Sequence, residues 1–258
     1  MKALIIRLDA PMMSFGSVMV DQHGYIDRFP GIAMFTGLIA NALGWEHSRF
    51  DRLQELQSRL EYAARWDIRP ERMVDYHTVD LGQAKMKEPG WTTREEPEHR
   101  RGGKSAREGT HQRYRHYWTD GLMTAALTLK GDGLPDLATV CDALHRPARP
   151  LFIGRKTCLP ARPLLDPETP VAEGKNLLEI LRQVPSWDRK GSRQSRECTL
   201  IACWPMELQV TDRDIVRRVF DLRDWFNDIP AGSRWRAEGM LRVAEHLRGE
   251  SHIDVTHD

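Results

Sequence analysis

Cysteine is scarce in this chain of 258 residues, which contains only Cys141, Cys158, Cys198 and Cys203. Because no two of them have the Cys-x-x-Cys spacing of a structural zinc site, we expect reduced, mostly buried thiols and neither a metal nor a cofactor. Long apolar runs are absent as well. The N-terminal run at residues 3–8 is too short for a signal peptide, and no uncharged segment is long enough to span a membrane. We therefore expect a cytoplasmic protein without membrane contact.

The chain also lacks an overall excess of charge, since 38 lysines and arginines stand against 37 acids and give a formal net charge of +1. The distribution is nevertheless uneven. Residues 100–117 hold six cations and one acid, so this segment carries +5 and the rest of the chain about −4. The near-neutral total conceals a strongly basic segment, which indicates an anionic partner.

The order of predicted strands and helices indicates the fold class. The patterns predict strands at residues 3–8, 60–68 and 122–129, and helices at residues 35–45, 50–60 and 135–144. This order, strand–helix–strand repeated after an insertion, is the split pattern of α+β ferredoxin-like and RRM-like domains. We predict one such domain over residues 1–165.

Beyond residue 165 the pattern predicts a smaller C-terminal domain, residues 166–258, with a helical tail. We expect a helix at residues 177–184 and a strand at residues 198–204. Thr211 or Asp212 is placed to cap another helix, and its apolar positions would be Ile215, Val219, Leu222 and Phe226. The pattern at residues 235–247 predicts a last amphipathic helix.

A long insertion at residues 69–118 separates the two halves of the predicted RRM-like domain. We expect it to lack regular structure, and a loop of this length in a compact domain usually has a function. Lys104, Arg113 and Arg115 lie near the aromatic residue Tyr117. An arm that becomes ordered on nucleic acid or on a neighbouring subunit is favoured over a solvated loop with chance charge.

A second cationic segment is the turn at residues 150–158, which contains Phe152, Gly154, Arg155 and Lys156. An aromatic ring can stack on an unpaired base, and adjacent cations neutralise phosphate. Glycine permits a close approach of another backbone. Together with the insertion, this turn indicates a protein that binds RNA.

Several short motifs occur in an order that resembles a known family. They are Arg7-Leu8, Pro11-Met12, Arg28-Phe29-Pro30, Asn41-Ala42-Leu43-Gly44, Asp75-Tyr76-His77-Thr78 and Phe152-Ile153-Gly154-Arg155-Lys156-Thr157-Cys158. Over residues 1–165 the chain resembles the CasD family, the RAMP subunits of the type I-E CRISPR surveillance complex Cascade. The apolar segment at residues 31–34 departs from the family pattern, which has a polar or basic residue there.

The resemblance implies an RRM-like body with a protruding thumb, here residues 69–118. In that family these parts hold the 5′ handle of the CRISPR RNA, cap the filament of CasC subunits and help to dock the large subunit CasA. Target DNA is met only through the assembled complex. By this resemblance Arg115 packs against a handle base and Tyr117 follows it with the family's two-residue spacing. We expect splayed handle bases to stack on Arg115, Tyr117 or Phe152. Phe152 replaces a tyrosine near the handle, and Arg155 and Lys156 match a paired-cation motif.

Three functions remain open at this stage: an RNA-binding scaffold without catalysis, a processing endoribonuclease, and an adaptor that binds only proteins. Metal-free RNA cleavage needs a base and a cation, for which Tyr76, His77 and Lys104 are the available set. We favour the scaffold, in which His77 hydrogen-bonds RNA or backbone. Arg28 either contacts RNA or pairs with an acid of the body, and Asp75 is expected to form a turn.

Overall fold

The larger of two main sheets forms the body of the protein. The computed structural model describes residues 1–17, 19, 21–80, 110–190, 198–208 and 210–243. Seven strands lie in the order β10-β13-β9-β4-β7-β1-β8, and every neighbouring pair is antiparallel. Their bounds are β1 (Lys2–Asp9), β4 (Leu60–Ile68), β7 (Leu122–Leu129), β8 (Val171–Glu173), β9 (Cys198–Pro205), β10 (Ile215–Val219) and β13 (Arg234–Val243).

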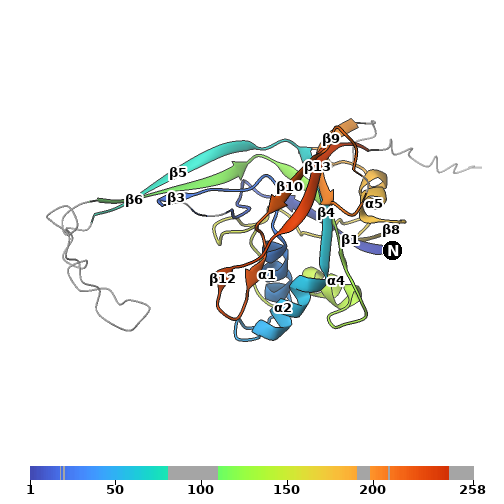
Figure 1. The fold of residues 1–258 in the computed structure, drawn as a ribbon, viewed down its shortest axis with the longest axis horizontal. Helices are drawn as coiled ribbons and strands as arrows, with labels where there is room; N and C mark the ends of the chain where they lie inside the picture. Colours follow the sequence, from blue (N-terminus) through green and yellow to red (C-terminus); the bar gives the residue numbers. More distant parts are fainter. Residues whose placement is uncertain (18, 20, 81–109, 191–197, 209, 244–258) are drawn as a thin grey trace, which may run out of the picture.

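Helices cover both faces of this sheet (Figure 1). The helices α1 (Ile32–Ala42), α2 (Phe50–Arg59) and α4 (Leu137–His145) pack on one face, and α5 (Leu177–Gln183) packs on the other. Side chains of β1 alternate between the two cores, because Leu4 and Ile6 join the first cluster while Ala3 and Ile5 join the second. Two covered faces explain why this strand is apolar almost throughout.

A charged network is buried on the α5 side of the sheet. The Arg7 guanidinium lies 2.9 Å from an Asp67 oxygen and 2.6 Å from an Asp166 oxygen, and Arg65 donates to Asp67 at 2.7 Å. Burial is the largest influence on Arg7 and lowers its pKa to about 10, so it remains charged at neutral pH. The network connects β1 and β4 to the segment that follows residue 165.

The predicted unstructured insertion is wrong for its described parts, which form a hairpin. Strand β5 (Glu71–Asp80) pairs with β6 (Thr110–Thr119) over ten residue pairs, a length of about 33 Å. Short strand β2 (Met12–Met13) pairs with the base of β6 at Trp118 and Thr119, and β3 (His23–Gly24) pairs with the middle of β6 at Tyr114 and Arg115. In Figure 1 this hairpin projects from the body. The sequence did not predict this hairpin because its two strands are separated by residues 81–109, which lie outside the described residues, and the whole insertion has the composition of a loop.

Two predicted C-terminal helices are also wrong. Residues 215–219 form β10, and residues 234–243 form β13, which pairs with β9 on one side and β10 on the other. The supposed helix face is not buried as a unit, since Ile215 is 61% and Phe226 is 70% exposed while Val219 is buried. Pairing with β9 over eight residues overrides local helix propensity. A small hairpin of β11 (Arg223–Asp224) and β12 (Ile229–Pro230) follows β10, and residues 244–247 lie outside the described ranges.

The mixed α+β class is confirmed. The four other predicted helices and the four predicted strands are also confirmed, and their observed ends differ from the predicted ones by at most three residues. Strands from both sides of residue 165 lie in one sheet, and the division into two domains stays a prediction. In the described ranges, no helix is long and apolar enough to cross a membrane.

Candidate nucleic-acid interface

One face of the hairpin collects several of the predicted site residues. In its antiparallel register His77 lies opposite Arg113, and Asp75 lies opposite Arg115. Residues directly opposite each other in such a pair project to the same face. The hairpin therefore brings His77, Arg113 and Arg115 together, although 36 residues separate His77 from Arg113 in sequence.

Hydrogen bonds distinguish the members of this face. The Nε2 atom of His77 lies 2.5 Å from a carboxylate oxygen of Asp75, and both side chains are partly exposed. Asp75 therefore lies inside a strand and pairs with His77, and its predicted turn role is wrong. Arg113 donates to the carbonyl oxygen of Asp21 at 3.1 Å. The side chain of Arg115 is exposed and forms no hydrogen bond or ion pair with any residue that the structure describes. It is thus free to contact phosphate.

Tyr117 does not fit its predicted stacking role. Its side chain is only 2% exposed and belongs to the main apolar cluster. The guanidinium carbon of Arg155 lies 4.8 Å from the centre of its ring. The ring is therefore already packed, and we assign Tyr117 to the core at the base of the hairpin.

The turn at residues 150–158 is attached to this base through Arg155. Its guanidinium donates to the carbonyl oxygens of His116 at 2.8 Å and Gly24 at 3.1 Å. Because these bonds and the Tyr117 contact occupy Arg155, it joins the turn to β6 and β3. Lys156, the next residue, is exposed, and the side chain of Phe152 is half-buried. Of the two cations predicted to bind RNA, Arg155 is therefore bonded to the body, whereas Lys156 is exposed.

The remaining predicted residues lie apart from these. Arg28 is 3.6 Å from the buried carboxylate of Glu238, so it pairs with an acid of the body, as one of the two expectations stated. Its side chain is still 49% exposed. Lys104 lies outside the described residues. Among described residues, no group of three or more histidines, cysteines, aspartates or glutamates is arranged to hold a metal ion.

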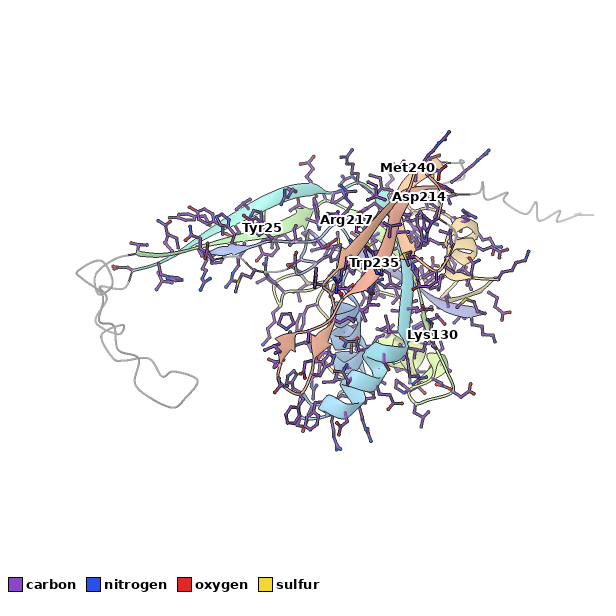
Figure 2. All side chains as sticks on the ribbon, in the orientation of Figure 1. Tyr25, Lys130, Asp214, Arg217, Trp235 and Met240 are labelled. Atoms are coloured by element: carbon purple, nitrogen blue, oxygen red, sulfur yellow. The ribbon has the colours of Figure 1, made fainter. Side chains whose placement is uncertain are left out.

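The opposite hairpin face carries a row of aromatic rings that the sequence patterns did not reveal. The ring of His23 stacks on Tyr114 with centres 4.7 Å apart, Tyr76 lies 5.1 Å from Tyr114, and Tyr25 lies 5.0 Å from His116. Figure 2 shows Tyr25 beside the hairpin. The sequence did contain one signal for this row. Cations and rings alternate along Arg113, Tyr114, Arg115 and His116, and successive residues of a strand project to opposite faces.

The neutral form of one histidine in this row is favoured. Burial, followed by the nearby Arg72, His23 and Arg155, lowers the pKa of His116 below its ordinary value. Neither ring nitrogen of His116 has a hydrogen-bond partner among the described residues. One face of the hairpin thus presents Arg113 and Arg115 together with Asp75, and the other presents the aromatic rings with Arg72 beside Trp118.

Replacing Arg155 with alanine is expected to lower the free energy of unfolding by about 1.5–3 kcal/mol, because two carbonyl groups lose a charged donor. Lys156→Ala is the matched control, since the exposed neighbouring side chain should contribute less than about 0.5 kcal/mol. Urea unfolding of both variants measures the difference. Equal stabilities for the two variants would contradict the structural role of Arg155.

Solved structures with the same arrangement of sheets and helices define the fold class. A chain of a CRISPR RNA-guided surveillance complex superposes with a TM-score of 0.65 and 21% sequence identity, over 93% of this chain and 90% of that one. A crystal structure of a Cas protein superposes with a TM-score of 0.59 and 20% identity, over 95% and 98% of the two chains. At these identities the likeness shows the fold, which is that of CRISPR-associated proteins.

The family follows from the sequence comparisons. The family model described as CRISPR-associated protein (Cas_Cas5) matches residues 3–237. The CRISPR system Cascade subunit CasD of Escherichia coli (strain K12) is 30% identical over 169 residues, which cover 62% of this chain and 68% of that protein. This chain belongs to the CRISPR-associated protein (Cas_Cas5) family, and its resemblance to CasD is confirmed.

Proposed function

We propose that this protein is a non-catalytic subunit of a type I-E Cascade complex that binds the 5′ handle of the CRISPR RNA. The observation that carries the proposal is the hairpin face with His77, Arg113 and Arg115, in a chain of this family. Phosphate contacts by such cations provide affinity without sequence readout, and splayed bases stacked on side chains provide specificity. The half-buried ring of Phe152 and the exposed Lys156 extend the contact.

The proposed assembly follows from the same family relationship. We take the body as an RRM-like domain and the hairpin with residues 81–109 as its thumb. The protein would cap one end of a CasC filament, contact CasA and meet target DNA only through the assembled complex, in the cytoplasm. Exposed strands of a projecting hairpin are suited to contact a neighbouring subunit, because their backbone and side chains are accessible from both faces.

A processing endoribonuclease is less well supported by the site geometry. Tyr76 and His77 are successive residues of β5, so their side chains project to opposite faces of the hairpin. Tyr76 packs against Tyr114 in the aromatic row, whereas His77 pairs with Asp75. A general base and its partner must reach the same reacting group, and these two side chains face apart.

The test is co-expression of the chain with CasC and a repeat-derived RNA, then gel analysis of the retained RNA and binding measurements at several salt concentrations. Arg115→Ala combined with Lys156→Ala is expected to weaken RNA binding by on the order of tenfold, because two phosphate contacts are lost. The slope of log K against log salt should fall by about 1.4. Arg155 is left intact, since its loss would disturb the fold.

The matched control combines Arg146→Ala with Lys175→Ala. Both residues are exposed cations, and they flank α4 and α5, on a part of the body away from the hairpin (Figure 1). RNA binding that falls equally in both double variants would reflect net charge alone and would contradict the proposed site. Discrete cleavage by the purified chain, abolished by His77→Ala, would establish the endoribonuclease instead.

A further inference from the structure

Two hollows adjoin on the surface at the base of the hairpin. One is bordered by Arg217 and Arg218 of β10, and the other reaches Tyr25 and the turn at Arg155. The residues that line both are Gly16, Ser17, Gly31, Phe220 and Asp221. Figure 2 shows Tyr25 beside the hairpin and Arg217 on the neighbouring part of the body. Because the two hollows share these residues, they form one groove, which we name the β10 groove.

The β10 groove has more available positive than negative charge. Its acids Asp27 and Asp221 are already ion-paired with arginines of β13, at 2.7 and 2.8 Å. Arg217 is 54% exposed, and its ion pair with Glu238 is long, at 3.9 Å. Arg218 donates to the hydroxyl of a serine at 2.8 Å, which leaves its charge without an acid among the described residues. Anionic groups are therefore the complementary ligands.

An exposed aromatic ring lies where the two hollows meet. The Phe220 side chain is 58% exposed, which is unusual for so large an apolar group. The Arg218 guanidinium carbon lies 5.4 Å from the centre of this ring. An aromatic ring beside a cation is the combination that holds single-stranded nucleic acid, since the ring stacks on a base and the cation meets phosphate.

The lining of the β10 groove has open space at Gly16. This glycine is exposed, and a Cβ atom added to it would have no atom within 4 Å. Nothing in the surrounding body would therefore be displaced by a side chain at this position. A ligand strand can approach the backbone closely there, and a larger residue would occupy the space instead.

We propose that the β10 groove binds a nucleotide of the same RNA strand that contacts the hairpin. Phe220 stacks on its base, and Arg217 and Arg218, which project to opposite sides of the edge strand β10 and both border the groove, meet the phosphates that flank it. This inference rests on the proposed function and extends the RNA contact to residues beyond 165. RNA is favoured over an apolar protein segment, because such a segment would cover both guanidinium groups without supplying an anion.

Filling the groove is the sharpest test, with the full chain and the same repeat-derived RNA as the probe. Gly16→Leu is expected to weaken RNA binding by on the order of tenfold while the midpoint of urea unfolding stays unchanged. Gly16→Ala, which adds a single carbon in open space, is the matched control and should bind nearly as the natural chain does. Arg217→Ala with Arg218→Ala should lower the salt slope by about 1.4.

The outcomes separate this inference from the proposed function. If Gly16→Leu and the β10 double variant keep full RNA affinity while Arg115→Ala with Lys156→Ala loses it, the β10 groove does not bind RNA and the hairpin site stands. If the groove variants keep RNA affinity but no longer co-purify CasC, the groove binds protein and the inference is overturned. If the natural chain retains no RNA, both proposals fail.

Discussion

Replacing Arg7 with leucine is expected to lower the free energy of unfolding by about 3–5 kcal/mol, the largest change that we predict. The substitution leaves the carboxylate of Asp166 without its 2.6 Å ion pair, and Asp67 loses its ion pair with Arg7 but keeps that with Arg65. These side chains are almost completely buried, so water cannot replace the lost charge. Urea unfolding should show a lower midpoint with an unchanged slope.

Lys2→Leu on the same strand is the control for this prediction. Lys2 and its partner Glu173 are 67% and 71% exposed, so their ion pair should contribute less than about 1 kcal/mol. A destabilisation by Arg7→Leu no greater than that by Lys2→Leu would contradict the role of the buried network. It would mean that the body tolerates the loss of the Arg7 charge beside Asp67 and Asp166, for example by taking up water.

Replacing Gly154 with alanine is expected to destabilise the protein by about 3 kcal/mol and to displace the cationic turn. Gly154 has a φ angle of +93°, and a Cβ atom there would lie 1.8 Å from the backbone oxygen of Ser14. The turn can relieve this overlap only by moving away from β2. That movement would also separate Arg155 from the carbonyl oxygens of His116 and Gly24.

Gly131→Ala separates backbone strain from the steric overlap. Gly131 also has a positive φ angle, +70°, but a Cβ atom there would have no atom within 4 Å. We expect this variant to lose only about 1 kcal/mol. Thermal unfolding of the two variants measures the difference, and RNA binding by Gly154→Ala reports the displaced turn. Equal melting temperatures would show that the turn accommodates the extra carbon without moving.

The strands of the central sheet could be predicted because their signal is local. Residues 60–68 and 122–129 form β4 and β7 with the predicted bounds, since each is a short apolar run that ends at turn residues. The turn at residues 150–158 was likewise identified from its glycine and its neighbouring cations. The family resemblance depended on such short segments, and the comparisons confirm it.

The parts that were wrong depend on pairing between distant segments. Strand β13 has apolar residues at spacings compatible with a helix, but eight residues of β9 pair with it and β10 pairs on its other side. The hairpin strands were taken as a loop because polar residues alternate with aromatic ones and neither face is wholly buried. The residues of β13, or of either hairpin strand, do not by themselves indicate the segment with which that strand pairs.

The sequence by itself determined the mixed α+β class, the family and the chemistry of the site, because residue types and short motifs specify cations, aromatic rings and local backbone. Only the tertiary structure decided which of these groups are available. Arg115 and Tyr117 lie two residues apart on the same face of β6, but the body covers that face only at Tyr117, so Arg115 stays exposed and Tyr117 joins the core. Backbone carbonyls of distant strands occupy Arg155, while Lys156 beside it stays exposed. Exposure depends on packing between distant segments, and no local pattern specifies it.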